Sequence, residues 1–299
     1  MGAAEAIRIG FKLARRSRSA VWILFLANLG LSALAGLPIY RGILRFTGHS
    51  LMSQTLSRSF SVDWLVDFSV NSVGSLERYA QVIGLLGLLA IPMNTILAGG
   101  VLGRLQRGFD QPYALGDFFR DVGRYSGRLL RLMIIALVGY WIVFRVCNQA
   151  LGGLVNDWLR DSLDDRPVFW ARLGVSALVI LGLGLINLVT DFARVKLVLE
   201  GGTSAAVAFL GALGFSLGHL RRALLVYLVP SLCGIVLLLV YRAVLPWQLV
   251  NSPLAEAGKY REPLTLALLF FAQQLVILGR YWFRVSTWAG EWSLYSGNR

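Results

Sequence analysis

The residue of this sequence best placed to do chemistry away from water is Asp191. It follows eighteen uncharged residues, and Arg194 comes three positions later in the segment LINLVTDFARVKLVLEGG. A carboxylate withdrawn from water needs a cationic partner. Arg194 would share its helix face, and Arg280 or Arg284 could reach it from another helix. We expect a structural ion pair here, with a solvated interfacial aspartate as the alternative.

A second set of polar side chains interrupts otherwise apolar runs. Such groups can line a path for a solute, or they can bond helix to helix at about 0.6 kcal/mol each. Both interpretations stay open, and a path would require Asn94, Asn187 and Gln273 to face one another. Arg145, deep in its run, could instead extend its side chain to the membrane surface. The candidate path residues are Asn94, Asn187, Gln273, Gln274 and Arg145.

Sequence signatures of enzymes are missing. The chain has no Gly-x-Ser-x-Gly, no His-Glu-x-x-His and no Walker loop. Cys147 and Cys233 lie inside apolar runs, and His49 and His219 are far apart, so no metal-ligand spacing exists. We therefore expect no catalytic residues, no metal and no cofactor.

The composition is typical of an all-α polytopic membrane protein. Charged residues make up 15% of the 299 and hydrophobic residues 56%, with a mean hydropathy of +0.63, whereas soluble domains have about 25% charged residues. The net charge of +13 comes from bases at the ends of apolar segments. That placement favours anionic lipid headgroups as partners, and no nucleic-acid motif accompanies it.

Six apolar runs have about the length that crosses a bilayer, which is roughly 20 residues. They predict one integral membrane domain, 1–299, with both termini on one side. Eighteen of the 29 lysines and arginines fall on that side, which the positive-inside rule assigns to the cytoplasm. The expected spans are about 20–40, 80–103, 131–151, 171–193, 223–245 and 264–284.

Similar segments precede the first, third and fifth spans. Each is amphipathic, ends in arginines and runs into a span. The first and third copies align without gaps, so that Gly10-Phe11 matches Gly214-Phe215. We therefore expect three helical hairpins with cytoplasmic amphipathic helices at the lipid interface. Small-residue pairs that favour close helix packing are Ser32/Gly36, Gly99/Gly103 and Gly214/Gly218.

A family resemblance rests on the segment DFAR at 191–194, the following LGFSLGHLRRALLVYLV and the final GRYWFRVSTWAGEWSLY. Over residues 185–295 the chain resembles uncharacterised bacterial multi-span inner-membrane proteins. It is also similar to the membrane domain fused to some glycerophosphodiester phosphodiesterases, although it has no phosphodiesterase domain. The resemblance implies a bacterial inner-membrane location and no activity.

These observations favour a non-catalytic membrane subunit or scaffold of a larger assembly, with other membrane proteins as partners. The alternative is a transporter or a lipid-handling permease that uses the polar residues between the hairpins. An intramembrane enzyme is disfavoured because Asp191 has no second acid within a span.

The topology is testable by cysteine labelling. We expect Ser162→Cys to react with an impermeant reagent from outside, and Ser126→Cys to react only after permeabilisation. Reaction of both from one side, or the reverse pattern, would contradict six spans with cytoplasmic termini.

Overall fold

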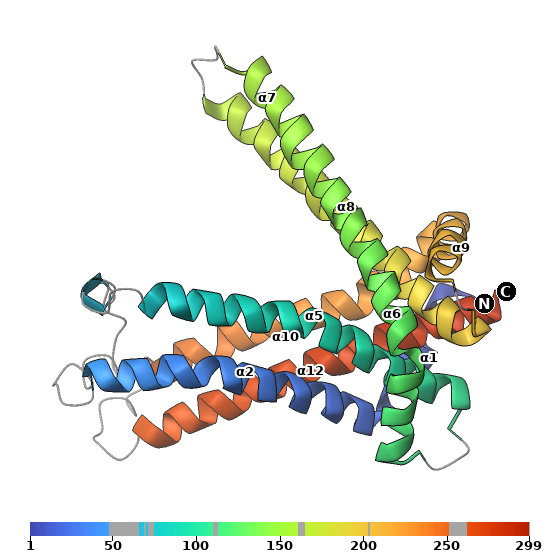
Figure 1. Ribbon diagram of the computed structural model, residues 1–299, viewed down its shortest axis with the longest axis horizontal. Helices are drawn as coiled ribbons and strands as arrows, with labels where there is room; N and C mark the ends of the chain where they lie inside the picture. The colour runs from blue at the N-terminus through green and yellow to red at the C-terminus, as the bar shows by residue number, and fades with distance from the viewer. Residues whose placement is uncertain are drawn as a thin grey trace. The chain divides into compact units, whose positions relative to one another are not determined.

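The computed structural model describes residues 1–47, 66–68, 70, 75–109, 113–160, 165–202, 204–250 and 262–298. All regular secondary structure within these ranges is helical (Figure 1). Ser162 and His49 lie outside the described residues. The chain forms two compact units: unit 1 is residues 1–22 with 95–299, and unit 2 is residues 23–94.

Within the described ranges, five helical segments are long and apolar enough to cross a membrane, which makes the chain a multi-pass membrane protein. The sixth expected span lies in α12 (Glu262–Gly297), whose apolar part carries Gln273, Gln274 and Arg280 and which is not among the five. The five segments are Arg18–Arg45, Glu77–Arg107, Leu115–Trp158, Arg166–Glu200 and Leu220–Ala243.

These segments belong to helices that extend beyond the expected spans. The first two lie in α2 and α5, and the third is continuous through α6, η1 and α7, where η1 is a π-helix. The last two lie in α8 and α10. The bounds are α2 (Arg18–Thr47), α5 (Ser75–Arg107), α6 (Leu115–Val143), η1 (Phe144–Leu151), α7 (Gly152–Trp158), α8 (Asp165–Glu200) and α10 (Leu220–Val250).

The sequence predicted an amphipathic segment before the first, third and fifth spans, and two of these three segments are separate helices. α1 (Ala3–Arg16) ends before Ser17, and α9 (Ala205–Gly218) ends before His219. The Ser204 hydroxyl caps α9 by accepting from the Val207 amide. The middle copy differs from its prediction, because α6 runs unbroken from Leu115 into its span and forms no separate interfacial helix.

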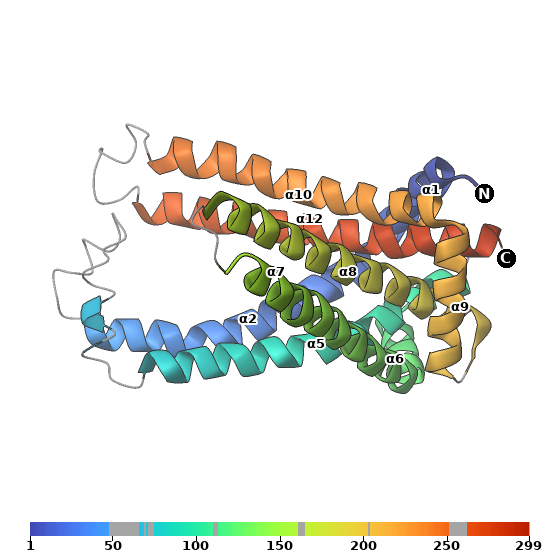
Figure 2. The same cartoon turned by 90° about the horizontal axis from the view of Figure 1, so that it is seen from above.

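Within unit 1, α6, η1 and α7 lie beside α8 and form what we call the arm. Figure 1 shows the arm diverging from the paired helices α10 and α12, and Figure 2 shows the same pairs from above. Only the last third of α8 is well buried. Its buried residues run from Leu188 to Val198, whereas residues 166–187 are half-buried or exposed. The arm therefore joins the rest of unit 1 through the end of α8 and through the buried first half of α6, from Phe118 to Ala136.

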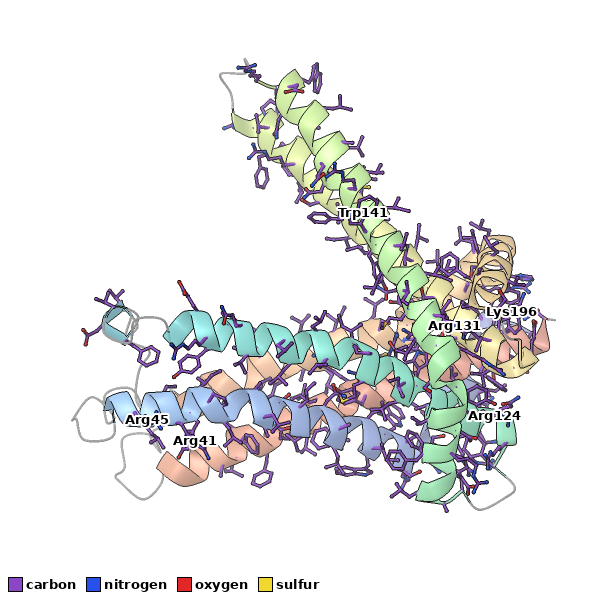
Figure 3. All side chains as sticks on the ribbon, viewed as in Figure 1. Arg41, Arg45, Arg124, Arg131, Trp141 and Lys196 are labelled. Atoms are coloured by element: carbon purple, nitrogen blue, oxygen red, sulfur yellow. The ribbon has the colours of Figure 1, made fainter. Side chains whose placement is uncertain are left out.

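Basic side chains gather where the arm begins. Figure 3 labels Arg124, Arg131 and Lys196 near the base of the arm and Trp141 farther along it. In unit 2, Arg41 and Arg45 lie near the end of α2. The bases at the start of the arm flank its apolar part, as expected for charges that bound a membrane span.

The helix α1 packs on α12 through small residues. Ala6, Gly10 and Ala14 are buried, and a Cβ at Gly10 would lie 2.6 Å from the Ser286 carbonyl oxygen and 2.8 Å from the Gly290 amide nitrogen. Only glycine permits this approach of two backbones. The sequence predicted an amphipathic helix at the lipid interface, but this face of α1 packs on protein.

The predicted glycine pairs have different outcomes. A Cβ at Gly99 or Gly103 would contact α6 side chains within 3.2 Å, so that pair forms the close seam that the sequence predicted. A Cβ at Gly36, Gly214 or Gly218 would meet nothing within 4 Å. Gly214 therefore aligns with Gly10 in sequence but does not share its packing.

The contrast between these glycines predicts opposite effects of one substitution. Gly10→Ala should lower stability in detergent by about 1–3 kcal/mol, because the added methyl group meets backbone atoms that cannot move aside. Gly214→Ala should be neutral or stabilising by up to about 1 kcal/mol, because alanine favours a helix interior. Thermal melts of both variants test this, and equal destabilisation would contradict the α1–α12 packing.

Candidate functional site

The candidate site is a buried ionic cluster at the end of α8. This helix contributes Asp191 and Arg194, one turn apart on the same face. From α12 come Arg284, Trp288 and Glu291, whose spacing of four and three residues places them on one face of that helix. The two faces meet, so the cluster joins the arm to α12.

Asp191 is the centre of the cluster and is 1% exposed. The Arg284 guanidinium approaches both carboxylate oxygens, with NH1 2.8 Å from Oδ2 and NH2 2.9 Å from Oδ1. Arg194 NH1 donates to Oδ1 at 2.9 Å, and the Trp288 indole N–H donates to the same oxygen at 3.3 Å. The two-pronged Arg284 contact is the strong geometry for an arginine and a carboxylate.

Aromatic side chains surround these charges. The Arg284 guanidinium carbon lies 4.9 Å from the centroid of the Trp288 ring, within the range of a cation–π contact. Tyr140 on α6 and Tyr227 on α10 interact electrostatically with Asp191. The direct contacts of the carboxylate come from α8 and α12, and the charge of Asp191 acts on side chains of α6 and α10.

Glu291 is the unexpected member of the cluster. It is 0% exposed, and neither of its carboxyl oxygens has a hydrogen-bond partner among the described residues. Burial, and then the charge of Asp191, raise the pKa of Glu291 well above its ordinary value. Burial therefore favours the neutral acid at Glu291, while both arginines contact Asp191.

The structure brings together three of the four predicted ion-pair residues. Asp191, Arg194 and Arg284 meet as described, and the burial of Asp191 argues against the solvated alternative. Arg280 is exposed and has no ion pair within the described ranges. It lies one turn before Arg284, about 6 Å along the helix, and so misses Asp191.

The predicted polar-path residues use other partners. In unit 2, the Asn94 and Asn28 amides each donate to the other, at 2.9 and 2.8 Å. In unit 1, Asn187 accepts from the Tyr140 hydroxyl at 2.7 Å. Both asparagines thus bond helix to helix.

Among the described residues, the remaining path candidates share no common lining. Gln273 and Arg145 are exposed. Gln274 Oε1 is buried without a hydrogen-bond partner in the described part of the chain. No pocket described in the structure contains any of these three residues.

A second buried acid, Asp121 on α6, was missed by the sequence analysis. Arg107 NH2 donates to Asp121 Oδ1 at 2.6 Å, and the Tyr113 hydroxyl donates to Oδ2 at 2.9 Å. Burial, and then the hydrogen bond to Asp121, raise the pKa of Tyr113. Gly103 leaves room for the carboxylate beside α5. This cluster fastens the end of α5 to the start of α6.

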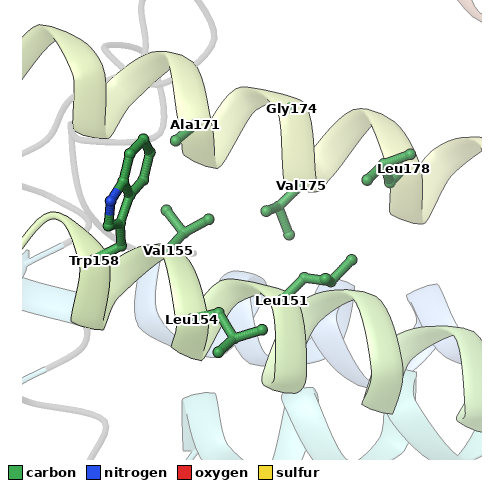
Figure 4. Close-up of a pocket in the computed structure, with 8 residues that line it drawn as sticks. All are labelled: Leu151, Leu154, Val155, Trp158, Ala171, Gly174, Val175 and Leu178. Carbon is green, nitrogen blue, oxygen red and sulfur yellow. The ribbon is translucent and has the colours of Figure 1, made fainter.

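An apolar hollow of about 420 Å³ lies near the far end of the arm, between η1–α7 and α8 (Figure 4). Leu151 and Trp158 line one side, and Ala171 and Leu178 line the other. Specific ligand sites combine apolar walls with a few convergent polar groups. This hollow has only apolar residues in its lining.

Chemically, the ionic cluster can hold charge and carry a proton. It has no nucleophile beside a base, and the described residues contain no group of three His, Cys, Asp or Glu that could hold a metal ion. His219 instead stacks on Phe215, with ring centroids 4.7 Å apart.

Comparison with protein-family models, with curated proteins and with solved structures gives no match.

A double-mutant cycle tests the ionic link between α8 and α12. Asp191→Ala should destabilise the protein in detergent by about 3 kcal/mol, because it leaves Arg284 without its carboxylate. Arg284→Ala should couple to it strongly, whereas Arg280→Ala should be near neutral and uncoupled. A parent-like melt for Asp191→Ala, or equal coupling to Arg280, would contradict the assigned pairing.

The raised pKa of Glu291 predicts a stability that falls as pH rises. Above its ordinary value of 4.5, the unfolded chain releases this proton while the folded chain retains it, so the native state loses relative stability up to the folded pKa. Glu291→Gln keeps the shape without the proton and should flatten this part of the pH profile. Melts from about pH 5 to pH 8 measure it, and an unchanged slope in the variant would refute the role of Glu291.

Proposed function

We propose that this chain is a non-catalytic integral membrane subunit or scaffold of a larger membrane assembly. In this proposal α12 provides a sixth span, the six spans form three hairpins, and both termini are cytoplasmic. Helices α1 and α9 lie at the cytoplasmic interface of a bacterial inner membrane. The resemblance of residues 185–295 to bacterial multi-span proteins supports that location.

The observation that carries the proposal is the small share of apolar surface that the chain covers by itself. In each of the five candidate spans, only 17–22% of the most apolar stretch is buried inside the protein. Large side chains such as Trp141 (65% exposed), Ile180 (69%) and Leu181 (64%) lie uncovered along the arm. Lipid or neighbouring subunits must cover this surface.

The middle of the arm gives a reason to expect protein as well as lipid. The π-helix η1 carries Arg145, Asn148 and Gln149, all exposed. None of the three has a hydrogen bond or ion pair to the described residues. Polar groups facing hydrocarbon are costly and usually face other helices, and π-helical segments often occur at functional sites. A partner helix would satisfy these groups.

The permease alternative has less support from the geometry. A solute path needs polar groups that converge on a common space, and Asn94 and Asn187 are already engaged by Asn28 and Tyr140. The buried Glu291 is the remaining feature that a proton-coupled transporter could use.

Purification in mild detergent separates the two functions. A subunit should co-purify with a stoichiometric membrane partner, and Asn148→Leu with Gln149→Leu should release that partner, because η1 would lose its polar contacts. Ile180→Ala, a change at another exposed position, this one on α8, serves as the control and should retain the partner. Quantitative mass spectrometry of the purified material measures both.

A lone, monodisperse chain would contradict the subunit proposal. If that chain carried a bound solute, it would favour the permease.

A further inference from the structure

An open groove of about 520 Å³ lies where α1 and the start of α2 meet α10 and α12. Arg15 and Arg18 contribute its basic lining, and the other walls are apolar, including Leu237, Leu275 and Trp282. The Trp282 ring also packs on Phe11 of α1, with centroids 5.4 Å apart. The groove therefore follows α12 from α1 toward Leu275, seven residues or about 10 Å away along the helix.

The positive charge of this groove has no counterion among the residues that the structure describes. Arg15 and Arg18 are exposed and form no ion pair with any residue in the described ranges. Glu5 is the only acid on α1, and it lies near the other end of that helix. A negatively charged ligand would be attracted to the arginine end.

The apolar walls of the groove indicate that the ligand also has a hydrocarbon part. Leu275 is 67% exposed, so it offers surface that is best covered by hydrocarbon. Two tryptophans, Trp22 and Trp282, line the groove beside the arginines, and tryptophan favours the headgroup level of a membrane. The lining thus changes from charged to aromatic to aliphatic, as an amphiphile does.

We propose that this groove binds one anionic phospholipid. Its phosphate lies between Arg15 and Arg18, and one acyl chain follows α12 past Trp282 to Leu275. This inference goes beyond the proposed subunit role and does not depend on it, because the groove is built within unit 1 alone.

Native mass spectrometry of the detergent-solubilised protein tests the site. The protein is titrated with phosphatidylglycerol or phosphatidylcholine of identical acyl chains, and the parent should bind one phosphatidylglycerol in preference. Arg15→Gln with Arg18→Gln should weaken phosphatidylglycerol binding by about 30-fold, the contribution expected from two bases near an anionic group. Arg8→Gln with Arg16→Gln removes the same charge from α1 outside the groove and should retain the preference.

The apolar part is tested separately. Leu275→Trp places a bulky ring in the groove at an exposed position and should reduce lipid binding while both arginines remain. Glycerol 3-phosphate, a soluble headgroup, should not compete.

Three results would overturn the proposal. Equal binding of the two lipids would remove the charge selection. Equal loss in the Arg8/Arg16 control would assign the effect to the general charge of α1. Effective competition by glycerol 3-phosphate would make the site one for free phosphate.

Discussion

One buried carboxylate, that of Asp191, holds the two principal parts of unit 1 together. It is shared by Arg194 on its own helix and by Arg284 on α12. A buried ion pair adds little net stability when compared with apolar packing. Removing one partner, however, leaves the other charge buried and unpaired, which costs about 3–5 kcal/mol. The ion pair instead determines how the two helices are positioned, because it fixes the level along α12 at which the end of α8 packs. The contact is one of two that attach the arm, because α8 is well buried only from Leu188 onward and α6 packs separately on the end of α5.

The protonation of Glu291 determines the net charge of this ionic cluster. With its proton, the cluster holds two guanidinium groups against one carboxylate and keeps a net positive charge. Without the proton, Glu291 would compete with Asp191 for Arg284 and Arg194, both of which interact with it electrostatically. The α8–α12 link therefore lies beside a buried acid whose pKa is raised by burial, on the part of α12 that follows its apolar run.

Several parts of this structure were predictable because they depend on local chemistry. Uncharged runs of about 20 residues indicate membrane helices whatever their neighbours are, and Asp191 at the end of such a run requires a cation. The seam at Gly99 and Gly103 follows from the same reasoning, since small residues four apart allow close approach.

Other parts could not be predicted, because they depend on the register between separate helices and on how far each helix continues beyond its apolar run. The choice of Arg284 over Arg280 is a matter of one helical turn between two separate helices. Glu291 was missed because span six was expected to end at Arg284, whereas α12 continues to Gly297; the shared face of Arg284, Trp288 and Glu291 was the available signal. Gly10 and Gly214 have similar sequence surroundings, but only Gly10 meets a second backbone.

The central claim is that Asp191 fixes the arm relative to α12, and a distance measurement tests it most directly. Spin labels at Trp158 on the arm and Leu232 on α10, both exposed, would be placed in a background with Cys147 and Cys233 replaced by alanine. Double electron–electron resonance should give a narrow distance distribution in the parent. Asp191→Asn, which keeps the side-chain shape and removes the charge, should broaden it. The same narrow distribution in both proteins would show that packing alone positions the arm and would contradict the claim.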